Sequence, residues 1–300
     1  MMNFEEFKAW VKENITSKDW KETSQVEISV VKKNNGVSKA GLFIRESGQD
    51  VSPILYLDDY YIHYQNGELL ENVIKKIRDD YNEKVQMAAV KIPNLQEFEN
   101  VRGKIIYRLV NYEKNKELLE DCPHRRLHDL AVTFRWVAHI DNDGVSTSLI
   151  TNRQVKEWGV TVNDLVLAAQ QNTPRLFPAK IIDMEEMLAG KVSFILYPSA
   201  IPMYILTNEQ EVNGASALLY GDVLKDFANK KGTGMYILPS SIHEVILLPA
   251  DRIDDPTKLL SMVHDVNTTV VSIGDVLSDS VYYYDRKTDH ITEIVSDEKM

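Results

Sequence analysis

The sequence predicts an α+β fold of mixed, mostly antiparallel sheets with flanking helices, arranged as two subdomains. Strand-like segments alternate irregularly with segments of helical periodicity, and most neighbouring strands are joined by connections too short for the crossovers that parallel strands need. The 300 residues are 44% hydrophobic and 26% charged, which is typical of a globular chain that buries a sizeable core. No internal repeat or low-complexity segment interrupts this pattern.

The first part of the chain predicts two helices and a hairpin. Apolar residues at helical spacing between Phe4 and Ile15 favour an opening amphipathic helix. Residues 26–31 and 40–45 are two strands, and Asn35-Gly36 between them tolerates the positive φ of a hairpin turn. Residues 69–81 carry the clearest helical stripe, whose apolar side we expect to pack on the hairpin.

A soft boundary follows at Cys122-Pro123, which divides the chain into N-terminal and C-terminal α+β subdomains, 1–122 and 123–300. Before it, 103–112 predicts a strand, and a short charged helix ends near Glu120. After it, a long strand begins at Leu127, and 145–150 returns antiparallel across a turn at 141–144.

The remaining elements are predicted from caps, turns and apolar periodicity. Thr161 and Asp164 form a capping-box-like start for a helix that Pro174 should stop, and a Lys-Lys-Gly-Thr-Gly segment should close the helix over 215–230. Asp255-Pro256 should begin a further helix. The strands are expected at 203–207, 235–238, 245–248, 281–284 and 291–295.

Charge and cysteine content exclude several classes of function. A formal net charge of −11 without clustered cations opposes binding to nucleic acid, which needs several cations on its phosphates. The single cysteine, Cys122, cannot form an internal disulfide, and the first residues do not have the features of a signal peptide, so we expect a cytoplasmic protein. No apolar run approaches the length of a membrane span.

The segment with the most chemistry is a corner, Ser240-Ser241-Ile242-His243-Glu244, between two apolar strands. In a functional interpretation, His243 is a base, Glu244 orients it or supplies acid, and Ser240 or Ser241 is nucleophile or donor. Two residues of strand separate Cβ atoms by roughly 6–7 Å, too far for direct proton transfer between Ser241 and His243. We therefore favour a structural interpretation, in which the serines cap the corner and His243 with Glu244 fasten the second strand.

Two further groups of residues are candidate binding surfaces. Free amides near Asn213, Gly214 and Ser216, where a strand leads into a helix, could hold an anion, although we favour plain helix capping. A dense cluster of tyrosines is typical of protein interfaces or of half-buried packing around a short helix. Its members are Tyr56, Tyr60, Tyr61 and Tyr64, with Asp58 and Asp59 between them.

We predict no metal site and no cofactor. Cys122, His124, His128 and Asp129 have the donor types of a zinc site. However, Arg125 and Arg126 lie between these donors and would repel a dication.

Several phrases along the chain resemble a bacterial family catalogued as a domain of unknown function, number five-six-eight-eight. They are Met2-Asn-Phe-Glu-Glu-Phe, Lys33-Asn-Asn-Gly-Val, Tyr56-Leu-Asp-Asp-Tyr-Tyr, Leu109-Val-Asn, Asp129-Leu-Ala-Val-Thr, Trp158-Gly-Val and Tyr236-Ile-Leu-Pro-Ser-Ser-Ile-His-Glu-Val. The C-terminal half also resembles, more distantly, a second bacterial cytoplasmic family of unknown function. Neither resemblance implies an activity or a catalytic residue.

The leading hypothesis is therefore a cytoplasmic, non-catalytic protein that binds another macromolecule or a small ligand. It depends on the absence of a complete catalytic arrangement, including any Gly-x-Ser-x-Gly elbow. The alternative is a hydrolase or transferase that uses the Ser240–Glu244 corner. The sequence leaves the partner, the substrate and the oligomeric state open.

Overall fold

Every strand pair in the described part of the chain is antiparallel, which confirms the predicted α+β class. The structure is a computed structural model that describes residues 1–16, 25–45, 53–89, 95–141, 144–189, 201–239 and 241–294. These residues fall into two units, Met1–Pro93 and Asn94–Met300. The boundary expected after residue 122 falls inside the second unit, where strands on both sides of it pair with each other.

The first unit is built on a three-stranded sheet in the order β1-β2-β3, formed by β1 (Gln25–Lys32), β2 (Ser38–Arg45) and β3 (Ile54–Tyr56). The turn between β1 and β2 is the short 3₁₀ helix η1 (Asn34–Gly36). Asn35 and Gly36 have φ of 57° and 72°, as the hairpin prediction required. The predicted hairpin is therefore confirmed.

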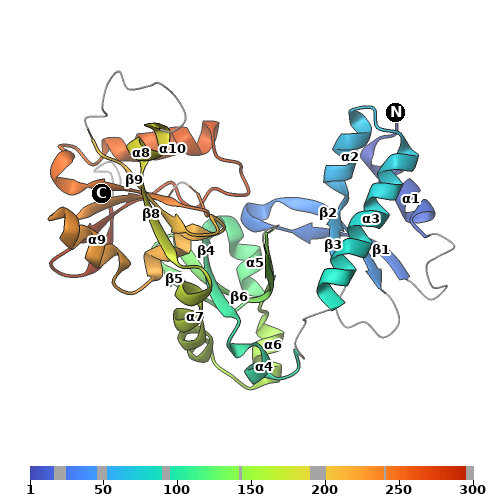
Figure 1. The fold of residues 1–300 in the computed structure, drawn as a ribbon, viewed down its shortest axis with the longest axis horizontal. Coiled ribbons are helices and arrows are strands. Elements are labelled where there is room, and N and C mark those ends of the chain that lie inside the picture. The colour runs from blue at the N-terminus through green and yellow to red at the C-terminus, as the bar shows by residue number, and fades with distance from the viewer. Residues whose placement is uncertain are drawn as a thin grey trace. The chain divides into compact units, whose positions relative to one another are not determined.

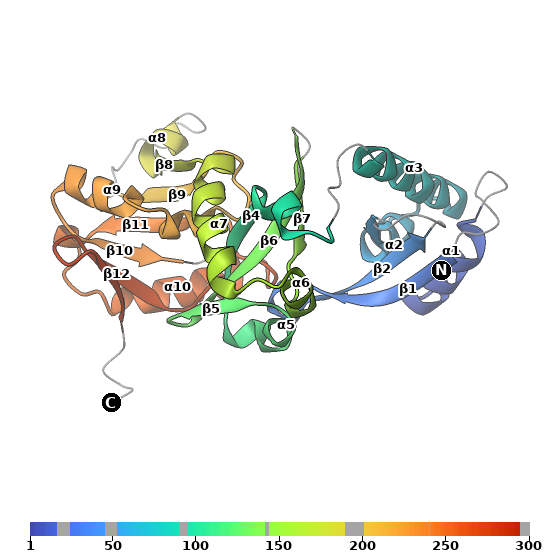
Figure 2. The same cartoon turned by 90° about the horizontal axis from the view of Figure 1, so that it is seen from below.

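Helices α1 (Phe4–Asn14), α2 (Leu57–Gln65) and α3 (Leu70–Ala89) form the core of the first unit with this sheet (Figures 1 and 2). Alternate residues of β2, Ala40, Leu42 and Ile44, are buried against Phe7 and Ile77 of the helices. The opening helix is thus confirmed, and so is the packing of the 69–81 stripe on the hairpin.

The second unit contains two sheets. A six-stranded sheet has the order β13-β12-β10-β11-β9-β8, and in a four-stranded sheet β6 pairs with β4 along one edge and with β5 and β7 along the other. The strands are β4 (Ile105–Asn111), β5 (His124–Leu127), β6 (Leu130–Asp141), β7 (Gly144–Leu149), β8 (Ala179–Asp183), β9 (Tyr204–Asn208), β10 (Met235–Leu238), β11 (Val245–Pro249), β12 (Val281–Asp285) and β13 (His290–Ile294).

Helices cover these sheets and join them. Helix α10 packs its Leu259 and Val263 on the six-stranded sheet, whereas α7 lies along β4 of the smaller sheet (Figure 2). The helices of this unit are α4 (Phe98–Arg102), η2 (Glu113–Asn115), α5 (Lys116–Glu120), α6 (Asn152–Trp158), α7 (Val162–Leu176), α8 (Met184–Ala189), η3 (Gly214–Leu219), α9 (Val223–Lys231), η4 (Ala250–Arg252) and α10 (Lys258–Thr269). No described helix is both long and apolar enough to cross a membrane.

Three local predictions for this unit differ from the structure. The chain after Pro123 already forms the strand β5, and the turn lies at His128, whose φ is 54°. Helix α7 continues past Pro174, because only the proline's own amide is missing and Phe177 N still donates to Thr173 O. The helix expected over 215–230 is broken into η3 and α9 by Asp222, whose φ of 66° is left-handed.

Candidate functional site

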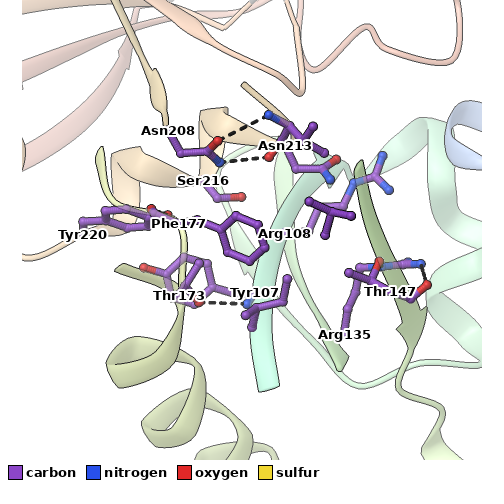
Figure 3. A pocket seen from close by; sticks show the side chains of 13 residues that line it. Tyr107, Arg108, Arg135, Thr147, Thr173, Phe177, Asn208, Asn213, Ser216 and Tyr220 are labelled. Carbon is purple, nitrogen blue, oxygen red and sulfur yellow. Dashed lines mark hydrogen bonds between the residues drawn. The ribbon is translucent and has the colours of Figure 1, made fainter. Parts of the chain in front are cut away.

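A small pocket lies in the second unit beside the edge of β4 that pairs with no described strand, called here the free edge (Figure 3). It encloses ≈ 20 Å³, enough for about one water, and it opens to solvent. Both sheets, α7 and η3 contribute to its wall. The lining residues are Ile106, Tyr107, Arg108, Arg135, Val145, Thr147, Thr173, Phe177, Asn208, Val212, Asn213, Ser216 and Tyr220.

Side chains take the place of a missing strand along the free edge of β4. The backbone N–H of Tyr107 donates to Thr173 Oγ1, and that of Leu109 donates to Ser216 Oγ, both at 3.2 Å. Exposed strand amides need partners, so these two hydroxyls fix α7 and η3 beside the strand. The pocket wall is therefore a built part of the fold.

Arg108 and Arg135 lie on the same face of the four-stranded sheet. Arg135 is directly opposite Ile106 in the β4–β6 register, and residues two apart on a strand share a face. Thr147 of β7 holds Arg135, because its Oγ1 accepts from Arg135 Nε at 2.7 Å and its carbonyl accepts from the same guanidinium at 3.1 Å. Two guanidinium groups thus project from neighbouring strands into one region (Figure 3).

No described carboxylate forms an ion pair with the guanidinium of Arg108, although Asp275 is near enough to act on its charge. Its Nε is shut off from solvent and has no hydrogen-bond partner among the described residues. Burial, and then the nearby charge of Arg135, lower the pKa of Arg108 to about 9, while Asp275 opposes this shift. The group still carries its charge at neutral pH, so a cation is held here at a cost.

Tyr107 projects from β4 on the side opposite to Arg108, since successive strand residues alternate. Its side chain is 4% exposed, and its hydroxyl has no hydrogen-bond partner in the part of the chain that the structure describes. Burial, and then the neighbouring Tyr220, raise the pKa of Tyr107. The phenol is therefore neutral, and it is a second unsatisfied polar group beside the pocket.

Of the three predicted binding residues at 213–216, two line the pocket and one does not. Asn213 and Ser216 line the pocket, whereas Gly214 packs against Thr207 and the carbonyl of His243. The backbone amides of Ala215 and Ser216 donate to Ile242 O and Asn213 O, so neither is open to a ligand. The side chains, and not the amides, are what this segment offers to a ligand.

The corner around His243 adjoins this pocket through Asn213. The backbone N–H of Asn213 donates to His243 Nδ1 at 3.4 Å, and His243 Nε2 lies 3.5 Å from Asp275 Oδ1. Ser241 Oγ accepts from the backbone N–H of His243 at 3.0 Å, and its bond is therefore with the backbone and not with the ring. The imidazole is 35% exposed.

The other two residues proposed for this corner contribute less. Glu244 is half-buried, and no hydrogen bond or ion pair joins it to another described residue. Ser240 lies outside the described residues. The acid that the fold brings to the imidazole is Asp275, which is distant in sequence.

The tyrosine cluster is used within the first unit. Tyr60 donates to Asp80 at 2.6 Å, and Tyr61 donates to Met2 O at 3.0 Å. Tyr64 accepts from Met2 N at 2.9 Å, and Tyr56 accepts from the ammonium group of Lys33. Each phenol oxygen therefore has an internal partner.

The donors considered for zinc also have separate structural partners. The ring of His124 contacts Cys122 O at 3.0 Å, whereas that of His128 lies 3.2 Å from Ile291 O. Asp129 accepts from Ser278 and Tyr282. Within the described ranges no three His, Cys, Asp or Glu side chains gather as a metal site would require.

Sequence reasoning missed Arg108 and Asp275 as site residues. The sequence does contain a signal for Arg108: it is a charged residue within the apolar strand Ile105–Asn111, where burial of an unpaired charge is costly. Asp275 carried no such signal. It follows a helix in an irregular segment, and only the fold brings it to His243.

Comparison with known proteins gives a family and no activity. The model of a family of unknown function, DUF5688, matches residues 4–286. No curated protein and no solved structure matches the chain.

Proposed function

We propose that this chain, which belongs to the family of unknown function DUF5688, is a binding protein that holds a small molecule in the pocket beside β4. The observation that carries the proposal is the buried Nε of Arg108, which has no hydrogen-bond partner among the described residues. A buried donor of a charged group that lacks a partner costs roughly 1–3 kcal/mol or more. A ligand that accepts a hydrogen bond from Nε removes this cost, and its binding is favoured by the same amount.

The pocket has the composition of a small-molecule site. Four apolar side chains, Ile106, Val145, Phe177 and Val212, line it together with nine that carry a polar group, so it offers both apolar contact and hydrogen bonds that orient a ligand. Strongly perturbed ionisable groups also concentrate at binding sites, and the pKa of Arg108 is lowered to about 9 by burial and by Arg135.

A small ligand is a better candidate than a macromolecule bound by the tyrosine cluster. An interface tyrosine contributes a ring and a free polar tip. Here Tyr60 is 7% exposed, and the oxygens of Tyr61 and Tyr64 are occupied by the backbone of Met2. These contacts support an internal role, the attachment of α1 to α2.

A second candidate function is a hydrolase or transferase centred on His243. The observation in its favour is the partly exposed imidazole 3.5 Å from the carboxylate of Asp275, an arrangement that can orient a general base. Ser241 is 6% exposed and its Oγ bonds a backbone amide, which disfavours it as a nucleophile. A fluorophosphonate probe tests the form of this function that uses a serine nucleophile: labelling that is lost in His243→Ala would establish it, and no labelling of the wild type would remove it.

We also propose a cytoplasmic location in a bacterium and no nucleic-acid partner. The lone Cys122 is 1% exposed, and burial raises its pKa to about 11, so the thiol is unreactive. The net charge of −11 supports exclusion of nucleic acid. Fractionation of the native cells, with immunodetection of the chain, tests the location.

The test of the binding proposal is to fill the pocket. Val212 lies in the wall of the pocket, so the indole of Val212→Trp should fill it. Leu167→Trp is the control, because it places the same group on α7 at a residue that is 60% exposed. The full-length chain is incubated with a bacterial small-molecule extract, re-isolated, and its bound compounds are identified by mass spectrometry. We expect the wild type and Leu167→Trp to enrich the same compounds and Val212→Trp to lose them.

Two results would contradict the proposal. One is the recovery of no compound by the wild type over a column blank. The other is an unchanged set of compounds in a folded Val212→Trp variant, which would place binding elsewhere.

A further inference from the structure

The charges around the pocket narrow the class of ligand. We propose that Arg108, with Arg135 and Asn213 beside it, binds the oxyanion group of a small metabolite, a carboxylate or a phosphate. This inference rests on the proposed function and adds the ligand's chemistry to it.

Arg108 has a hydrogen-bond donor without a partner among the described residues. A guanidinium presents five N–H donors in a planar fork that matches carboxylate and phosphate oxygens. In known folds a shielded arginine is nearly always paired with an acid. Here no described carboxylate reaches ion-pair distance of Arg108, and its Nε has no hydrogen-bond partner among the described residues. The missing partner is thus an acceptor, and a negatively charged one matches best.

Charges of both signs lie near Arg108. Arg135 lies on the same face of the sheet and raises the cost of charging Arg108, while Asp275 acts in the opposite direction. The Asp275 carboxylate is already engaged, because Oδ2 accepts from Ser272 at 2.6 Å and Oδ1 faces His243. Arg108 therefore keeps a positive charge that no described acid pairs with, on a chain whose net charge is −11.

The neutral side chain of Asn213 lines the same pocket as the two arginines. Asn213 adopts φ of 52°, a left-handed conformation, and its amide bonds His243, which fixes the residue at the pocket wall. Its side-chain NH₂ can donate to an oxyanion. A cation would meet the guanidinium groups, so this wall selects against positively charged ligands.

The volume of the pocket limits how much of a ligand can enter it. The enclosed ≈ 20 Å³ has room for about one water, so one oxygen of a ligand can enter it while the rest lies toward the opening. An oxygen of a carboxylate or of a phosphate group meets this limit.

The experiment measures the melting temperature of the full-length chain with inorganic phosphate, with malonate, and with chloride at matched ionic strength. Arg108→Gln removes the charge, and Arg153→Gln, on the exposed surface of α6, is the matched control. We expect phosphate or malonate to raise the melting temperature of the wild type and of Arg153→Gln by about 2 °C or more above chloride. The gain should vanish in Arg108→Gln, and the more effective anion identifies the source of the oxyanion.

A second variant keeps the test decisive if Arg108→Gln fails to fold. Asn213→Asp keeps a residue type that accepts the left-handed backbone but adds a negative charge beside the arginines. It should also abolish the gain. The inference is overturned if neither anion exceeds chloride in the wild type, or if the gain persists in Arg108→Gln or Asn213→Asp.

The failure of this inference and the failure of the proposed function have different signatures. Should the extract experiment recover neutral or cationic compounds that Val212→Trp loses, the pocket binds small molecules and the oxyanion inference is wrong. Recovery of no compound at all, as stated above, removes the proposed function itself.

Discussion

The backbone N–H of Asn213 donates a hydrogen bond to Nδ1 of His243 at 3.4 Å. Because Nδ1 accepts, the neutral ring carries its proton on Nε2, the nitrogen that faces Asp275 at 3.5 Å. One imidazole therefore connects a wall residue of the pocket with the nearest acid. This makes His243 a positioning residue for Asn213, in addition to a fastener of the corner.

Replacing His243 separates these roles. His243→Ala removes the acceptor for Asn213 N and the partner of Asp275, and we expect it to lower stability by about 1 kcal/mol and to weaken anion binding. His243→Asn retains an oxygen near the position of Nδ1 and should recover most of the binding. Thermal melting gives the first quantity, and the anion-induced shift in melting temperature gives the second.

A purely structural His243 would give a different pattern. Both variants would then lose stability, but the shift produced by phosphate or malonate would remain that of the wild type. Glu244→Gln serves as the control, since Glu244 has no partner among the described residues and its change should alter neither quantity.

Gly214 should tolerate no side chain. A Cβ at this position would lie 2.1 Å from Thr207 Oγ1, 2.5 Å from the carbonyl oxygen of His243 and 2.7 Å from the backbone nitrogen of Asn208. Two of these atoms are backbone, so the fold must shift, and we expect Gly214→Ala to cost about 1–3 kcal/mol. Chemical denaturation measures the loss.

Gly221 is the matched control for this substitution. It lies seven positions further along the chain, its φ is not positive, and a Cβ there would meet nothing within 4 Å. Gly221→Ala should therefore be neutral or slightly stabilising. Equal losses in the two variants would show that the close packing at Gly214 does not matter.

The sequence predicts a helix or a turn correctly where the residues that cause it, such as a cap or a turn glycine, lie within the same short segment. Asn35-Gly36 predicted the hairpin, and the left-handed backbone at both residues is the reason it forms. The capping box of Thr161 and Asp164 is present, with reciprocal hydrogen bonds between them. Gly232 ends α9 with φ of 79°, as its position after two lysines indicated.

The site could be predicted only in part, because it is assembled from distant segments. Asn213 and Ser216 were candidates, and both line the pocket. Arg108 comes from an edge strand, and Asp275 from the segment after α10. No periodicity relates them, and the break at Asp222 that shapes η3 depends on an unusual backbone angle at a non-glycine residue.

The buried hydroxyl of Tyr107 provides a further prediction. It has no partner among the described residues and is 4% exposed, so Tyr107→Phe should stabilise the protein, by up to about 1–3 kcal/mol. Melting temperature at neutral pH measures the gain. A loss of stability instead would mean that the hydroxyl is bonded, for example to an internal water.

The protein should lose stability steeply at alkaline pH. Burial raises the pKa values of Tyr107, Tyr220 and Tyr282 above the ordinary tyrosine value of 10.0, with Asp129 adding to the effect at Tyr282. The unfolded chain then releases these protons more readily than the folded one, so stability is full below pH 10 and falls as pH rises beyond it. Each tyrosine contributes up to ~1.4 kcal/mol per pH unit.

Melting curves from pH ~8 to pH ~11, followed by tyrosinate absorbance, measure this loss. We expect Tyr107→Phe to have a shallower pH dependence, and the tyrosinate signal that this variant lacks to form in the wild type only with unfolding. Tyr112→Phe, at a half-exposed tyrosine of the same unit, is the control and should leave the slope unchanged. If the signal that Tyr107→Phe lacks forms well before unfolding in the wild type, the phenol of Tyr107 is open to solvent.

Asp129 fastens the β5–β6 turn to the six-stranded sheet, and this contact can be measured. Tyr282 donates to one carboxylate oxygen and Ser278 donates to the other at 2.6 Å, and the tyrosine is 2% exposed. Hydrogen bonds to a charged acceptor contribute about 1.5–3 kcal/mol, so Tyr282→Phe should lower the melting temperature by several degrees. Tyr283→Phe, the next residue on β12, should change it little, because Tyr283 is half-buried and its hydroxyl bonds no described residue. If the two variants melt together, the carboxylate of Asp129 draws its stability from other donors.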